Sequence, residues 1–290
     1  MPATRAATAR RAIREHRTLA VGCLLLGGIV LFALAAPLFG SPYATPLDGL
    51  TKSGQSHGVL SHGHLLGTDE LGRDMLARSA AGARTSLEIA FLANITSVGL
   101  GVLVGMAAAF YRGWIEQLLM RVTDVFLSIP TVISGLALAA VIGTTVIGIV
   151  AVVTALYWAW AARIVFGEAL ALRRRTFVEA AIAAGVPGRT VIRRHILPNL
   201  SSLILTLAAL NGAAVVSIGS GLSYLGAGIQ PPTPEWGNML ASGAGALDYA
   251  PHLLLVPLAL VVLTVFSFVL IGEALARRGA LSLRRSWLDI

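Results

Sequence analysis

Charged residues are scarce in this chain, and their scarcity indicates its class. Only 12% of the 290 residues are Asp, Glu, Lys or Arg, whereas 56% are hydrophobic. Soluble domains carry about 25% charged residues, so lipid must solvate much of this surface. The single cysteine, Cys23, excludes a disulfide within the chain. No segment alternates polar and apolar residues, which argues against a membrane β-barrel.

Lysine is nearly absent, and with it any nucleotide-binding loop. The only lysine, Lys52, follows Thr51 rather than glycine, so no GxxxxGK[ST] loop can form. The central parts of the apolar runs also lack Asp, Glu, Lys and Arg. This lack argues against an ion-coupled secondary transporter and against a membrane-embedded enzyme, which both place such groups inside the membrane. No catalytic residue and no resident cofactor are therefore predicted.

Six apolar runs are long enough to cross a bilayer, which takes about 20 residues in a helix. Each is apolar around its whole circumference, as in helices surrounded by lipid or by other helices. The predicted spans are residues 19–39, 89–110, 125–142, 146–165, 200–218 and 253–271. The third and fourth are joined by a few residues around Gly143, which predicts an antiparallel hairpin. The fold class is an all-α integral membrane protein with six transmembrane helices.

Basic residues indicate how these spans are oriented. If the amino terminus is cytoplasmic, all of the 22 Lys and Arg fall on the cytoplasmic side except Lys52, Arg73, Arg78 and Arg84. The positive-inside rule then places both termini and residues 177–199 in the cytoplasm. The net charge of +8 is explained by this topology and by anionic lipid, so no nucleic-acid partner is predicted.

The first span has a second interpretation. A basic segment precedes it, and Ala33-Leu34-Ala35 resembles a signal-peptide cleavage site. Because the apolar run continues to Phe39, we favour an uncleaved anchor. Three parts follow. Residues 1–83 are a tail, first span and external loop, residues 84–273 form the main transmembrane domain, and residues 274–290 form a cytoplasmic tail.

Residues 177–199, FVEAAIAAGVPGRTVIRRHILPN, form a basic insert between two spans. Residues 177–184 favour a helix, and Gly185 is expected to end it with positive φ. Thr190 is expected to cap a second short helix, and Pro198 to begin the fifth span. Ala180 and Ala181 belong to a ridge of small side chains that another protein could approach closely. An ordinary connecting loop is the alternative.

Several strings in the chain resemble the C-type permease subunit of dipeptide and oligopeptide ABC importers. The pattern Glu179-Ala180-Ala181, Gly185 and Leu197-Pro198 resembles the coupling loop that such permeases present to their ATPases. The more specific strings are HLLGTDELGRDMLAR at 64–78, DVFLSIP at 124–130, RIVFGEALALRRRTFVE at 163–179 and GLSYLGAGIQPPTPEWGNML at 221–240. The tail 274–290 departs from the family because it lacks the Asp-Pro-Arg ending.

The resemblance implies a type I ABC importer permease fold in a bacterial inner membrane. It implies four partners: a B-type permease, two ATP-binding subunits that hold ATP and magnesium, and an extracytoplasmic substrate-binding protein. The implied cargo is a peptide, with nickel or another small solute as the alternative. The implied ATPase-coupling residues are Glu179, Ala180, Ala181, Gly185, Val186, Arg193, His195 and Pro198.

Three further groups of residues are candidate sites. Asn94, Ser134 and Asn211 are candidates for the translocation path, although buried amides also join helices by hydrogen bonds. The external segment 230–236 is a candidate docking site for the binding protein, with a rigid turn as the alternative; its candidate residues are Gln230, Pro231, Pro232 and Trp236. The loop 41–84 is expected to contact the binding protein or the partner permease. Its histidines are interpreted as loop residues without a metal, with His57 and His62 solvated.

Overall fold

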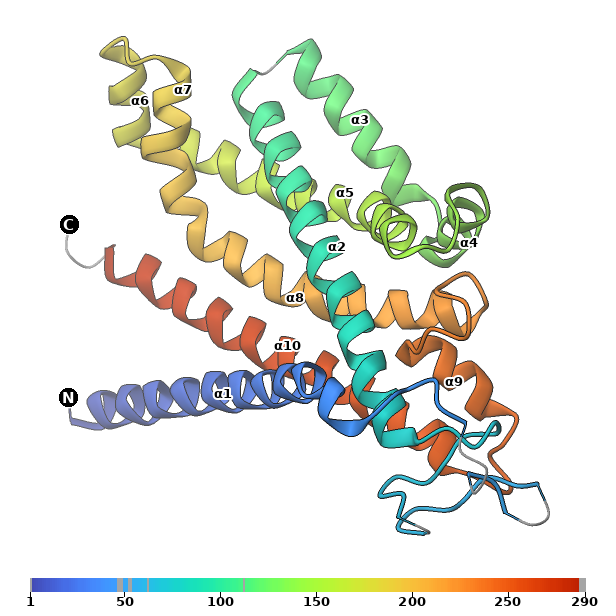
Figure 1. Ribbon diagram of the computed structural model, residues 1–290. Coiled ribbons are helices and arrows are strands. Elements are labelled where there is room, and N and C mark those ends of the chain that lie inside the picture. Colours follow the sequence, from blue (N-terminus) through green and yellow to red (C-terminus); the bar gives the residue numbers. More distant parts are fainter. Residues whose placement is uncertain (1, 46–48, 52–53, 62, 112, 287–290) are drawn as a thin grey trace.

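The computed structural model describes residues 2–45, 49–51, 54–61, 63–111 and 113–286. These residues form α-helices joined by short turns, with isolated β-bridges in the segment before α2 (Figure 1). The helices are α1 (Pro2–Leu34), α2 (Met75–Tyr111), α3 (Trp114–Ser128), α4 (Thr131–Ile142), α5 (Val146–Arg173), α6 (Thr176–Ala183), α7 (Gly188–Val191), α8 (Leu197–Tyr224), α9 (Trp236–Ala244) and α10 (His252–Ser286). Two short turns, η1 (Ala36–Phe39) and η2 (Ile192–Ile196), complete the series.

The third predicted span is wrong as a single helix. Among the described residues, five helices are long and apolar enough to cross a membrane, and a sixth crossing exists there only if α3 and α4 are counted together. These two helices meet at an angle of 97°. The break lies at Ile129, which adopts an extended conformation (φ −93°, ψ 133°) before Pro130. A residue before proline is driven out of the helical region, and proline has no N–H to continue the helix.

The second predicted span begins too late. The structure starts α2 at Met75 rather than at residue 89. The carboxylate of Asp74 accepts a hydrogen bond from the backbone N–H of Ala77 at 2.9 Å, so it caps the first turn. The external loop is correspondingly shorter than predicted. The fourth span also continues beyond residue 165 to Arg173.

Small residues let the central helices pack closely. Gly101 and Gly105 of α2 face α5, where an added methyl group would lie 2.5 Å from Ala161 Cβ and from Ala162 O respectively. On the outer side of the bundle, α1 packs along α10 at Gly22. α2, α5 and α8 therefore form the interior, and α1 and α10 are the least buried spans.

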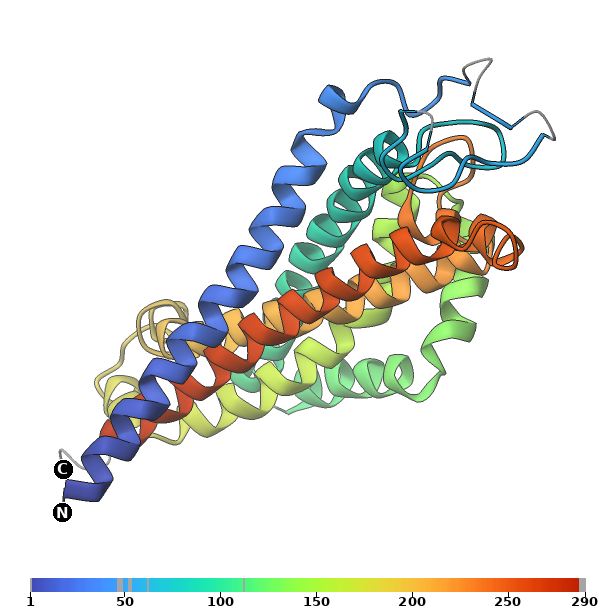
Figure 2. The same cartoon turned by 90° about the horizontal axis from the view of Figure 1, so that it is seen from below.

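The two ends of the bundle differ in what they carry. The described ends of α1 and α10 lie at the same end as α6 and α7, whereas α9 and the segment before α2 lie at the opposite end (Figures 1 and 2). α3 and α4 lie on the side of the bundle away from α1 (Figures 1 and 2). The predicted site residues fall mainly in three places: the α6–α7 end, the buried interface of α2 and α8, and the α9 end.

Candidate functional site

The turn after α6 adopts the conformation that the sequence predicts. α6 ends with Ala184 as its C-cap, and Gly185 follows with φ +76°. The N–H of Val186 donates to the carbonyl of Ala181 at 3.1 Å, and the N–H of Gly185 to that of Ile182 at 3.0 Å. This pair of bonds is the Schellman motif, in which the left-handed residue is normally glycine. The prediction for Gly185 is confirmed.

The second helix of this segment differs from the prediction. Pro187 occupies the N-cap position, α7 starts at Gly188, and Thr190 lies inside the helix rather than capping it. A proline already fixes the φ that the start of a helix needs, so no hydroxyl cap is required there. The fifth span is therefore continuous from Gly188 to Tyr224.

A π-helical turn, η2, connects α7 to α8. It ends with a hydrogen bond from the N–H of Leu197 to the carbonyl of Ile192. The next residue, Pro198, lacks an N–H, and its ring would clash with the carbonyl four residues earlier in a regular helix. The wider π turn lets the chain pass this proline without ending the helix. Pro198 thus lies at the start of α8 but in the middle of a longer continuous helix.

The α6–α7 segment (residues 176–196) is anchored firmly to the ends of the spanning helices. Val178, Val191 and Ile196 are buried in one cluster with residues of α2, α5 and α8. Arg173, at the end of α5, donates to the carbonyls of Ala109 and Phe110 at 3.0 and 2.7 Å. These are among the last carbonyls of α2, which have no partner within the helix. A force applied to the α6–α7 segment therefore reaches α2, α5 and α8 directly.

The predicted coupling residues divide into an outer and an inner set. Ala181, Val186 and His195 are half-buried, and the first two pack against the cluster. The other residues of that prediction lie exposed on the surface: Glu179, Ala180, Gly185, Arg193 and Pro198. The outer set therefore presents small, charged and turn residues to the surroundings, while the inner set holds the segment in place.

The buried amides of α2 and α8 bind each other. Asn211 is 1% exposed, and its Nδ2 donates to Asn94 Oδ1 and to Ser97 Oγ, both at 2.9 Å. Asn94 Nδ2 donates to the carbonyl of Ala208 on α8 at 2.9 Å. Both amides therefore join the two helices, as one of their two interpretations predicts. Ser134 lies apart from them on α4, and its hydroxyl donates to the carbonyl of Pro130. A place for these residues in the translocation path stays a prediction.

The external segment 230–236 is only partly available for docking. Gln230, Pro231 and Pro232 are exposed, and their docking role stays a prediction. Trp236 is fully buried against α1 and α2, and its indole N–H donates to the carbonyl of Ser79 at 3.2 Å. The inclusion of Trp236 is therefore wrong, because its side chain is part of the core and holds α9 to the bundle.

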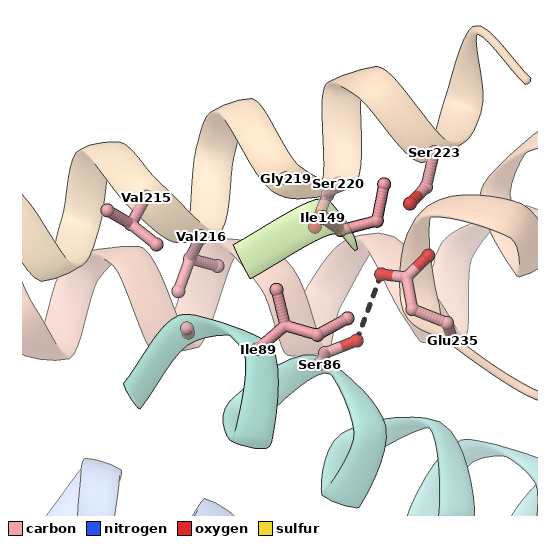
Figure 3. Close-up of a pocket in the computed structure, with 10 residues that line it drawn as sticks. Ser86, Ile89, Ile149, Val215, Val216, Gly219, Ser220, Ser223 and Glu235 are labelled. Carbon is pink, nitrogen blue, oxygen red and sulfur yellow. Dashed lines mark hydrogen bonds between the residues drawn. The ribbon is translucent and has the colours of Figure 1, made fainter. Parts of the chain in front are cut away.

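A buried carboxyl group beside Trp236 escaped the sequence prediction. Glu235 is 2% exposed, accepts from Ser86 Oγ at 3.0 Å and caps α9 by accepting from the N–H of Asn238 at 3.1 Å. Figure 3 shows it beside a small cavity, together with Ser220 and Ser223 of α8. Burial raises the pKa of Glu235 above its usual value, although hydrogen bonds oppose the shift. The sequence carries one signal for this cap, namely a glutamate three residues before an asparagine at the start of a helix.

The segment before α2 is tied together by its polar side chains. Asp69 accepts from the Nε of Arg73 at 2.7 Å and lies 3.1 Å from the Nε of Arg78. His64 Nδ1 lies 2.6 Å from Asp74 Oδ2. His57 is 5% exposed, so its interpretation as a solvated residue is wrong. His62 lies outside the described residues. Among the residues that the structure describes, no three His, Cys, Asp or Glu side chains gather as a metal site would require.

Comparison with known proteins identifies similar chains. Residues 101–280 match the family described as "Binding-protein-dependent transport system inner membrane component". The chain is 33% identical over 271 residues to the glutathione transport system permease protein GsiD of Pectobacterium atrosepticum, covering 92% of this chain and 87% of the relative. It is also 33% identical over 270 residues to the oligopeptide transport system permease protein OppC of Haemophilus influenzae, covering 92% and 85%.

A solved structure shares the fold. The inward-facing methionine ABC transporter MetNI contains a chain that matches with a TM-score of 0.60, covering 71% of this chain and 97% of that one. The sequence identity is 17%, so this similarity concerns the fold alone. The all-α type I ABC importer permease fold that the sequence predicts is confirmed.

Proposed function

This chain belongs to the family of binding-protein-dependent transport system inner membrane components, and we propose that it forms half of the translocation path of a peptide importer. Members of this family are multi-pass permease subunits of ABC importers, which work with ATPase and substrate-binding partners. The chain is thus a permease subunit rather than an enzyme. The relatives named for glutathione and oligopeptide transport support a peptide cargo.

The α6–α7 segment is the observation that carries this proposal. It offers exposed Glu179, Ala180 and Gly185 on one side and is anchored to α2, α5 and α8 on the other. We infer that an ATPase subunit docks against the exposed side. Closure of the ATPases would then displace the segment, and the buried cluster would pass that displacement to the spans.

The proposed assembly is heteromeric. This chain would pair with a B-type permease above two ATP-binding subunits, and those subunits would hold the ATP and magnesium. A substrate-binding protein would dock at the α9 end, with Gln230, Pro231 and Pro232 among its contacts. Both termini and the α6–α7 segment would lie in the cytoplasm, in agreement with the basic residues near that end.

Substitution of the α6–α7 turn tests the proposal. Gly185→Val places a β-branched residue at φ +76°, which costs about 1–2 kcal/mol and tilts the following helix. Glu179→Lys reverses an exposed charge without touching the buried cluster. In proteoliposomes with the partner subunits, we expect both variants to insert normally and to lose peptide uptake. ATP hydrolysis should stop responding to loaded binding protein.

Gly113→Val is the matched control, because Gly113 also has positive φ (+71°) and open space around it, but lies in the turn between α2 and α3. This control should keep uptake and stimulated hydrolysis. If Gly185→Val and Glu179→Lys also kept both, the α6–α7 segment would not be the coupling site.

A further inference from the structure

A charged pair lies on the exposed face where α3 and α5 meet. Asp124 of α3 accepts a hydrogen bond from Nη2 of Arg163 of α5. The side chains are 41% and 47% exposed respectively. On the same face of α3, Arg121 and Ser128 are exposed as well, and Val125 beside Asp124 is 59% exposed. Two charges on such a face require an explanation, because charges that face lipid are strongly unfavourable.

The pair lies within two helices rather than in a loop. Arg163 lies ten residues before the end of α5 at Arg173, and Asp124 lies ten residues after the start of α3 at Trp114. At 1.5 Å per residue, each is about 15 Å from the α6–α7 end of its helix. The face is also on the side of the bundle away from α1 (Figures 1 and 2).

The break between α3 and α4 lies close to the charged pair. α3 ends at Ser128, four residues or about 6 Å beyond Asp124. The last carbonyls of a helix have no backbone partner within it, and here that of Val125 accepts from Ser128 Oγ at 2.8 Å. Interrupted backbone at membrane depth is tolerated only where protein covers it or where it borders a water-filled space. The end of α3, with its exposed Ser128, therefore lies about one helical turn from the charged pair.

Both side chains keep unused capacity for hydrogen bonds. Arg163 donates from Nη2 to Asp124 and from Nη1 to the sulfur of Met120 at 3.6 Å. No further hydrogen bond of either side chain occurs within the part of the chain that the structure describes. A guanidinium has five N–H donors and a carboxylate has two acceptor oxygens. A ligand can therefore add to the pair or replace one partner.

We propose that Asp124 and Arg163 form a binding site for zwitterionic cargo in the translocation path. The ammonium group of the cargo would bind Asp124, where the negative end of the α3 dipole also favours a cation. The carboxylate of the cargo would bind the guanidinium of Arg163, which matches its two oxygens. In the absence of cargo the two side chains neutralise each other. This inference deepens the proposed function and rests on it.

Protection of a neighbouring cysteine tests the site directly. Val125→Cys, made in a Cys23→Ser background, places a thiol beside Asp124, and its reaction with a maleimide is followed in the purified transport complex. We expect alanyl-alanine to slow labelling in a saturable way. N-acetyl-alanyl-alanine amide, which lacks both charges, should give no protection. Equal protection by the two peptides, or none by either, would overturn the proposal.

Neutralisation of the pair gives the second arm of the test. Asp124→Asn and Arg163→Gln should each weaken protection by alanyl-alanine at least about tenfold, the loss expected for one charged hydrogen bond. The matched controls Glu273→Gln and Arg277→Gln remove an exposed pair on α10 and should leave protection unchanged. If neither neutralised variant weakened protection, the site would be wrong.

Uptake by the unmodified complex separates the two proposals. Import of peptide without protection of Val125→Cys would refute this site and leave the proposed function intact. Failure of the unmodified complex to import any peptide would refute the proposed cargo. The comparison of free and blocked peptides needs no change in the pair itself, so the test holds even if a neutralised variant fails to fold.

Discussion

The carboxyl group of Glu235 lies in an environment that disfavours its charged form. Its carboxyl group is 2% exposed, yet it caps α9 and bonds to Ser86 of α2, 149 residues earlier in the chain. Burial raises its pKa, because the charged form loses its hydration. The same group therefore joins α9 to α2 at this end of the bundle.

The stability of the protein should follow the titration of Glu235. A carboxyl group whose pKa is raised by folding makes its full contribution to the free energy of unfolding at pH values below its unfolded pKa, about 4.3. That contribution is lost as the pH rises through the folded pKa. We expect the melting temperature of the purified protein to fall as the pH rises from about 4.3 through the folded pKa of Glu235. The melting temperature of Glu235→Gln should fall less over the same pH range. Parallel melting curves for the two proteins across the same pH range would contradict the assignment.

At the scale of helices, the contact between α2 and α5 depends on glycine. An added Cβ at Gly101 would lie 2.5 Å from Ala161 Cβ and 2.8 Å from the carbonyl of Trp158. Backbone atoms cannot move aside as a flexible side chain can. The two helices therefore hold their separation because position 101 has no side chain. Gly99, two residues earlier on the same helix, has no such neighbours within 4 Å.

Gly101→Val should destabilise the protein by separating α2 from α5. Overpacking of this kind typically costs 1–3 kcal/mol. Gly99→Val is the matched control, because it makes the same change in helix propensity at an open position. The measurement is the midpoint of unfolding in a denaturing detergent. Equal midpoints for the two variants would show that the close approach of α2 and α5 does not limit stability.

At the scale of the whole molecule, the two ends of the bundle carry different segments. The α6–α7 segment and the described helix ends of the termini lie at one end, and α9 lies at the other (Figure 2). The spans between them carry the buried amide network of α2 and α8 and the charged pair of α3 and α5. Under the proposed function, partners that dock at opposite ends would communicate through the helices rather than by contact.

The orientation of the bundle in the membrane can be measured with two cysteines. In a Cys23→Ser background, Val59→Cys lies in the segment before α2 and Arg189→Cys lies in α7; both positions are exposed. We expect an impermeant maleimide to label Val59→Cys in spheroplasts and Arg189→Cys only in inverted membrane vesicles. The reverse pattern would place the α6–α7 segment outside and refute the cytoplasmic assignment.

Local sequence determined the features that depend on neighbouring residues. Apolar runs of spanning length located the five helices that are long enough to cross a membrane, since a helix satisfies its own backbone in lipid whatever surrounds it. Gly185 was predictable because its conformation is set by the turn that contains it. The break at Pro130 had a local signal as well, but the apolar composition continued across it and concealed the bend.

Tertiary structure alone decided which polar and aromatic side chains are buried and which meet. The sequence does not distinguish Trp236 in the core from Pro232 on the surface, because burial depends on helices far away in the chain. The same holds for Glu235 beside Ser86, and for Asp124 beside Arg163, 39 residues apart. Composition determined that this chain belongs in a membrane. Packing of the helices determined where, within that membrane, its few charges lie.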